Sequence, residues 1–199
     1  MANYNIVSDI SEALVRILRE GMVPDIIPNS EAISACHPSD RGDASLGVCL
    51  YDIRRNTDMD TTERIAVGAD KLRAPSVYIE LYYMITAYSS SDIKFRSLEE
   101  AKIIGRAIQI LEGNPVFKPE LYGKAFADMK YQPRIEMLDL DIEDKHRIWN
   151  ASDQPYKLSV FYKVYPAEIE SERIKKITRV TETEFTFGQM SDLNSGERK

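Results

Sequence analysis

The segment from Val77 to Tyr88 constrains the fold more than any other part of the sequence. Two sets of side chains alternate along it: Val77, Ile79, Leu81, Tyr83 and Ile85 on one face, and Tyr78, Glu80, Tyr82 and Met84 on the other. Because successive side chains of a strand point to opposite faces, both faces of this segment are largely apolar. That pattern is typical of a buried strand. We therefore expect Val77–Tyr88 to be a central strand of a sheet.

Three further segments predict strands by alternation. They are Ser45–Arg54, Ile135–Leu140 and Tyr156–Tyr165. The charged segment 55–74 has no clear period, and we expect a long loop or an insertion at the rim of the fold.

Three segments predict helices. Apolar residues recur at helical spacing over Asn5–Glu20, and Gly21 is the expected stop. Ser97 and Glu100 form a capping-box pattern that predicts the start of a second helix, which ends at Gly113. Asp141 is the expected cap of a short helix that reaches about Trp149.

These elements predict an α/β (mixed α+β) fold with a central mixed sheet flanked by helices. The chain has 199 residues, which suits one domain or one domain with a tail. We expect a core domain over residues 1–166 and a C-terminal extension over residues 167–199, where apolar and charged residues are interleaved.

Charge and composition disfavour several partners. The net charge of −6 argues against general nucleic-acid binding, which needs a basic surface. No apolar run approaches the roughly 20 residues that span a bilayer, and the first residues lack a signal-peptide pattern. We therefore expect folding in the cytoplasm, with Cys36 and Cys49 as reduced thiols, and no membrane partner.

Chemical motifs are scarce, so we predict no catalytic, cofactor-binding or metal-binding residues. Neither a glycine-rich phosphate loop nor a GxSxG nucleophile motif occurs. Cys36 and His37 are neighbours whose side chains diverge in an extended chain, and a Glu143-x-x-His146 pair lies on the short helix. Glu80, within an apolar strand, is a candidate for a perturbed carboxylate, or it faces a helix edge or a partner chain.

Tyrosines are concentrated on two of the predicted strands: Tyr78, Tyr82, Tyr83 and Tyr88 on one, and Tyr156, Tyr162 and Tyr165 on or beside the other. A tyrosine has a large apolar body and a polar tip, which suits a surface that is buried against another protein. The same residues also suit a core, and the sequence leaves both alternatives open.

The order and spacing of several stretches resemble the cap, or tail-terminator, proteins of extracellular contractile injection systems of the antifeeding-prophage type. These stretches are Ile10–Leu14 with Leu18–Glu20, Val48–Arg54, Tyr78–Ser89, Glu99–Glu100 with Ile104–Ala107, and Pro155–Val160. The most specific part is the strand LYYMITAY followed by the helix LEEAKIIGRAIQIL.

The resemblance implies a structural role and no reaction. Such proteins form a ring, usually six-fold, at the end of the tube away from the baseplate. The ring stops polymerisation of the inner tube and the sheath, and it holds the sheath end during contraction. The resemblance therefore implies self-association, sheath and inner-tube partners, and assembly in the bacterial cytoplasm before release in an extracellular particle.

Six apolar residues of the extension are candidates for contact with sheath subunits by edge pairing of strands: Ile169, Ile174, Ile177, Val180, Phe185 and Phe187. The alternative for this segment is a hairpin packed on its own domain. For the whole chain, one alternative function is a monomeric adaptor that binds a peptide strand or a small ligand on its sheet. Another is a hydrolase that uses His37 or His146.

Overall fold

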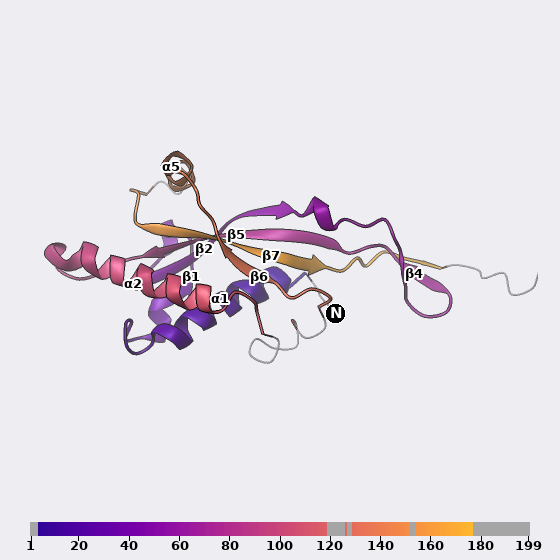
Figure 1. The fold of residues 1–199 in the computed structure, drawn as a ribbon, viewed down its shortest axis with the longest axis horizontal. Coiled ribbons are helices and arrows are strands. Elements are labelled where there is room, and N and C mark those ends of the chain that lie inside the picture. The colour runs from indigo at the N-terminus through magenta and orange to yellow at the C-terminus, as the bar shows by residue number, and fades with distance from the viewer. Residues whose placement is uncertain (1–3, 119–125, 127–128, 152–153, 177–199) are drawn as a thin grey trace, which may run out of the picture.

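The chain folds around a five-stranded mixed sheet (Figure 1). The computed structural model describes residues 4–118, 126, 129–151 and 154–176. The strand order is β1-β2-β5-β7-β6, in which β1 and β2 are parallel and all other neighbours are antiparallel. The strands are β1 (Ile33–Ala35), β2 (Leu46–Arg55), β5 (Val77–Ala87), β6 (Arg134–Met137) and β7 (Ser159–Ile169). The predicted fold class and the central position of β5 are confirmed.

Two helices cover one face of the sheet. They are α1 (Ile6–Met22) and α2 (Ile93–Gly113), which lie side by side below the sheet in Figure 1. Ile10, Leu14 and Leu18 of α1 are fully buried against the β5 side chains Leu81, Tyr83 and Ile85. The Tyr83 hydroxyl shares a hydrogen bond of 2.9 Å with the hydroxyl of Ser11. This layer contains most of the core.

Gly21 lies where α1 approaches α2 most closely, and its predicted role as a helix stop is wrong. Helix α1 continues to Met22. A Cβ atom at Gly21 would lie 2.6 Å from Cδ1 of Ile110 in α2. Arg106 of α2 also donates to the Gly21 carbonyl from Nε at 3.1 Å and from Nη2 at 2.9 Å. A side chain at this position would therefore force the Ile110 side chain to shift.

Helix α2 begins earlier than the capping-box pattern predicted. Its first residue is Ile93 and its N-cap is Asp92, so Ser97 lies inside the helix. Glu100, the predicted partner of Ser97, accepts instead from the Ser89 amide at 3.3 Å, and the neighbouring Glu99 carboxylate accepts from the hydroxyls of Ser89 and Ser91. These serines precede the helix, so the carboxylate fixes the turn between β5 and α2.

In the described part of the chain, the short helix α5 (Ile142–Asn150) covers part of the other face of the sheet and lies above it in Figure 1. The Asp141 side chain accepts from the Asp144 amide at 2.9 Å, which confirms the predicted cap. Trp149 is 1% exposed and packs with Cys49, Met84 and Phe161 in a second, smaller core.

A small three-stranded sheet, here called the arm, projects from the end of the main sheet at the right of Figure 1. It comprises β3 (Ile65–Ala66), β4 (Lys71–Arg73) and β8 (Ile174–Lys176). The segment predicted as a loop over residues 55–74 thus contains a hairpin, which also follows a short 3-10 helix, Thr57–Met59. Gly68, with φ of +86°, lies in its turn, a conformation that few other residues adopt.

Strand β7 extends beyond its predicted end. It passes Tyr165 and continues to Ile169, and Ala167 is fully buried in the core. The first residues of the predicted extension therefore belong to the main sheet. The division of the chain at residue 166 stays a prediction.

Candidate assembly surfaces

The side chains that were considered for catalysis have structural contacts. The His37 ring nitrogen Nδ1 lies 3.3 Å from the Ser39 amide and caps a 3-10 turn, Pro38–Asp40. The His146 ring stacks on Tyr156 with ring centres 4.8 Å apart. Among the residues that the structure describes, no group of three or more His, Cys, Asp or Glu side chains is placed to hold a metal ion.

Glu80 is hydrogen-bonded within the sheet. Its carboxylate accepts from the Tyr82 hydroxyl at 2.6 Å and from Asn56 Nδ2 at 3.2 Å. The Tyr82 pKa is raised to about 12, first by burial and then by this hydrogen bond to Glu80. The hydrogen bond stabilises the neutral form of Tyr82 and positions the two side chains.

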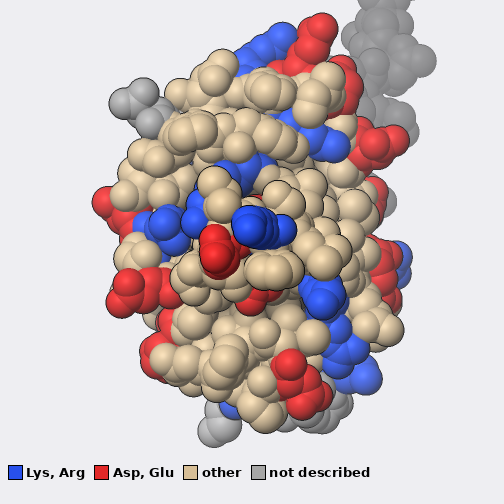
Figure 2. Space-filling model, turned by 90° about the vertical axis from the view of Figure 1, so that its left-hand side faces the viewer, with Lys and Arg blue, Asp and Glu red and all other residues tan. Residues whose placement is uncertain are grey.

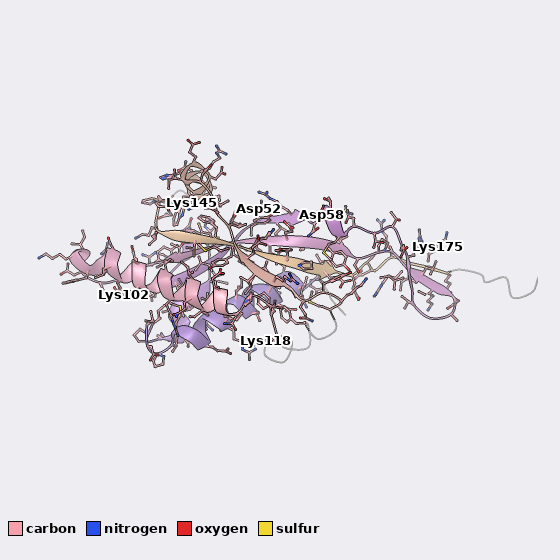
Figure 3. All side chains as sticks on the ribbon, in the orientation of Figure 1. Asp52, Asp58, Lys102, Lys118, Lys145 and Lys175 are labelled. Atoms are coloured by element: carbon pink, nitrogen blue, oxygen red, sulfur yellow. The ribbon has the colours of Figure 1, made fainter. Side chains whose placement is uncertain are left out.

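A groove of about 750 Å³ lies between α5 and the sheet, and we call it the α5 groove. Its floor consists of side chains from β2 and β5, and its walls come from the residues after β6, from α5 and from the turn that contains Pro38. The main apolar lining residues are Pro38, Leu50, Tyr51, Tyr82, Leu138, Leu140 and Ile148. Figure 3 marks this side of the sheet with Asp52 on β2 and Lys145 on α5, while Lys102 marks α2 on the opposite side.

Burial dominates the electrostatics of the groove. It raises the pKa of Tyr51 to about 12, and it raises the pKa of the Cys49 thiol to about 11. The charges at the rim are paired within the chain, since Arg54 Nε lies 2.7 Å from Asp52 and Arg147 Nη1 lies 3.1 Å from Asp144. The groove is therefore apolar and almost neutral, which suits an apolar protein segment better than an ion.

The first turns of α2 form a second apolar surface, here called the α2 tip (Ile93–Leu98). The exposed fractions of Ile93, Phe95 and Leu98 are 76%, 63% and 62%. The first buried residue of the helix is Ile103, so the tip extends past the part of the helix that contacts the sheet. Figure 2 shows this end of the molecule, where uncharged atoms surround a few charged side chains and most charge lies at the rim.

The arm is joined to the main sheet by a bidentate ion pair. Arg73 Nη1 and Nη2 lie 2.7 and 3.2 Å from the two carboxylate oxygens of Glu170. Both side chains are only about one-fifth exposed, at 20% and 22%. The Ala74 amide also donates to the Arg173 carbonyl at 2.9 Å. These bonds fix β8 against β4.

Two of the six predicted contact residues lie in the described part of the chain. Ile169 pairs with Val77 at the end of β7, and Ile174 pairs with Arg73 in the arm. Both are thus in strands that pair with their own chain, and Ile174 keeps 55% of its surface exposed. Ile177, Val180, Phe185 and Phe187 lie outside the described residues. The prediction that these six contact another protein stays a prediction.

The tyrosines divide between the two alternatives that the sequence left open. Tyr83 and Tyr162 are completely buried, and Tyr78 and Tyr88 are each 6% exposed. Tyr82 is half-buried and lines the α5 groove. Most of the set therefore fills the cores, and a minority lies on surface that another protein could cover.

Sequence reasoning missed the groove and the α2 tip. The groove is assembled from segments more than a hundred residues apart, which no local pattern signals. The tip had a usable signal, since Ile93, Phe95 and Leu98 are apolar residues beside a polar loop. Placing the helix start at Ser97 left the first two of them outside the helix.

Comparison with known proteins shows the family. The chain belongs to the Pvc16 N-terminal domain family, whose sequence model matches residues 9–183. This confirms the resemblance to contractile injection system terminators that the sequence indicated. Comparison with curated proteins finds no match.

The fold is similar to those of two solved terminator structures. One is the sheath/tube terminator of PVC, an extracellular contractile injection system, in its extended state. The match has a TM-score of 0.64 and 16% sequence identity, and it covers 94% of this chain and 65% of that chain. The other is the tube-terminating cap of the anti-feeding prophage. This match has a TM-score of 0.65 and 20% sequence identity, and it covers 90% of this chain and 61% of that chain. The chain thus spans less than two thirds of the length of either protein.

No helix in the described part of the chain has the length and apolar character that a membrane span requires.

Proposed function

We propose that this chain is a non-enzymatic structural cap. It terminates and stabilises the inner tube and the contractile sheath, at the end distal to the baseplate, in a phage-tail-like injection particle. The observation that carries the proposal is the family match over residues 9–183, together with a fold shared with two terminator structures over at least 90% of the chain. The chain is made in the bacterial cytoplasm and then becomes part of an extracellular particle.

A closed ring of identical copies, with six the expected number, is the assembly that we propose. One heterologous interface that repeats until it closes generates such a ring. Two features of the chain support this form of assembly. The layered core provides a rigid body, and the α5 groove and the α2 tip are two separate apolar surfaces on that body.

The arm and the C-terminal extension are the proposed contacts with sheath and tube. Strand β8 pairs with β4 on one side, and in the described residues its other edge carries no strand. An open strand edge is a template for pairing with another chain. Ile174, with the undescribed Ile177, Val180, Phe185 and Phe187, would supply the side chains of this contact, and Ile169 anchors its base.

Truncation tests the role of the extension. A variant that lacks Ser171–Lys199 keeps β7 and its buried Ala167, so the core should fold and still form a ring. We expect it to lose retention of the sheath. A truncated chain that still caps particles of normal length and stability would remove this assignment.

A monomeric adaptor is the second candidate function, and the α5 groove is the observation that favours it. A hollow of about 750 Å³ beside a sheet has the size of a small-ligand site. The number of copies of the chain in the assembled particle separates the two candidate functions, because an adaptor stays a single copy and a cap forms a ring.

Negative-stain microscopy of particles tests the proposed function. Cells that express the gene cluster with and without this chain provide the comparison. Loss of uniform length, with over-long or unstable sheaths, is the expected result without the chain. Particles of normal length and full stability in its absence would overturn the proposal and favour the adaptor.

A further inference from the structure

The α2 tip presents one exposed apolar face. At 100° per residue, Ile93 lies on the same side of the helix as the buried Ile104, Ala107 and Leu111. Phe95 and Leu98, three residues apart, lie together on roughly the opposite side, and the exposed Lys94 and Arg96 lie between the two apolar sides. A groove that receives Phe95 and Leu98 while Lys94 and Arg96 stay at its rim would cover this face without burying a charge.

The α5 groove is of the same order of size as the tip. The tip has six residues, so it is about 9 Å long at 1.5 Å per residue and about 10 Å wide with its side chains. A cylinder of those dimensions has a volume of about 700 Å³. The groove has about 750 Å³. Its lining is apolar and its rim charges are paired within the chain, so Phe95 and Leu98 would enter an apolar floor while Lys94 and Arg96 of the tip stay at the charged rim.

The tip and the groove lie on different parts of the same chain. None of the residues that line the groove belongs to α2. The groove lies on the α5 side of the sheet, while the tip projects from the left end of the molecule on the α1–α2 side (Figure 1). The chain therefore does not fill its own groove with its own tip, and each copy offers both halves of a contact at separate places.

We propose that the α2 tip of one copy inserts into the α5 groove of the next copy, and that this repeated contact joins the copies of the proposed ring. The inference rests on the proposed function. The contact is heterologous, because it joins two different surfaces, and contacts of that type form rings when the rotation between successive copies closes. Phe95 and Leu98 are the anchoring side chains, and Tyr51, Tyr82 and Leu140 form the surface that receives them.

Cysteine cross-linking in assembled particles tests the contact. In a Cys36→Ala, Cys49→Ala background, which removes the native thiols, Leu98→Cys with Ala151→Cys places one thiol on the tip and one at the groove, and both sites are accessible in the single copy. A short bis-maleimide should give a ladder of linked copies that ends at the size of the ring. Each single variant, and Leu98→Cys with Lys175→Cys on the arm, should give no ladder.

A charge on the tip provides a second test. Phe95→Asp should weaken association between copies at least about tenfold, because the contact would bury an unpaired carboxylate. Lys102→Asp is the control, since Lys102 is an exposed α2 residue outside the tip. Because both positions are exposed, neither substitution should change the melting temperature of the single copy by more than about a degree or two. This measurement separates lost association from lost folding.

The outcomes separate this inference from the proposed function. Two results would overturn the tip-in-groove contact while the cap function stands. One is a cross-link from Ala151→Cys to sheath, to tube or within its own chain. The other is the absence of a ladder in capped particles. Normal particles formed by Phe95→Asp would do the same. If particles of normal length form without the chain, the proposed cap function itself is refuted.

Discussion

Replacing Gly21 with alanine provides a sharp test of the packing between α1 and α2. The new Cβ would lie 2.6 Å from Cδ1 and 2.8 Å from Cγ1 of Ile110, well below ordinary contact distance. Overpacking of this kind costs about 1–3 kcal/mol. Replacing glycine by alanine within a helix returns about 1 kcal/mol. We therefore expect Gly21→Ala to lower the free energy of unfolding by about 1 kcal/mol.

Gly105 is the matched control. It also lies within a helix, α2, but nothing lies within 4 Å of an added Cβ. Gly105→Ala should therefore show only the helix-propensity gain, about 0.5–1 kcal/mol of stabilisation. Urea unfolding and thermal unfolding, both followed by circular dichroism, measure the two variants. Their melting temperatures should move in opposite directions, by about 2–4 °C per kcal/mol.

A double-mutant cycle completes the test. Ile110→Ala removes the atoms that the new Cβ would meet, so Gly21→Ala should become stabilising in that background. The expected coupling free energy is about 2 kcal/mol, within the range for residues in contact. If Gly21→Ala stabilises the wild-type chain as much as Gly105→Ala does, the close helix contact described here is incorrect.

Three further predictions concern α5, the arm and the groove. Asp141→Ala should destabilise the chain by about 1 kcal/mol in urea unfolding, because the Asp144 amide loses its cap; no change would contradict the cap. Arg73→Ala should speed amide exchange of β8 while the exchange of β5 amides stays unchanged, and Glu170→Gln should have a weaker effect in the same direction. Stability should fall as pH rises from 9 towards 11, because the unfolded Cys49 thiol ionises near 9 and the folded thiol only near 11. Cys49→Ala should flatten this fall between pH 9 and 10, before tyrosines contribute, and an unchanged profile would show that the thiol is not buried.

Local periodicity predicted the main sheet and failed where distant segments decide the structure. The alternation in Val77–Tyr88 located β5 because a strand covered on both faces needs apolar side chains on both. The hairpin of the arm was missed because β3 has only two residues and β4 only three, and β8, the strand that pairs with β4 from the other side, lies about a hundred residues later. Gly21 looked like a helix stop because its real constraint is a side chain of another helix, Ile110.

The candidate surfaces were less predictable than the fold. The family resemblance indicated a terminator, and the family match confirms it. Neither the groove nor the tip followed from any motif, because each depends on what the packed core leaves uncovered. Leu138 and Ile148, for example, pack against the second core and also line the groove.

The attachment of the arm determines how a pulling force would enter the molecule. Strand β5 begins at the arm, β7 ends at it, and β2 leads into it through residues 56–64, so tension on the arm draws these three neighbouring strands in the same direction. The hydrogen bonds among them are spared, and the load falls as shear on the outer ladders, β1 with β2 and β6 with β7. Because the hydrogen bonds between β6 and β7 are perpendicular to the strands, that ladder resists from Arg134 to Met137 at once. The chain would bear such tension best along the axis of its sheet.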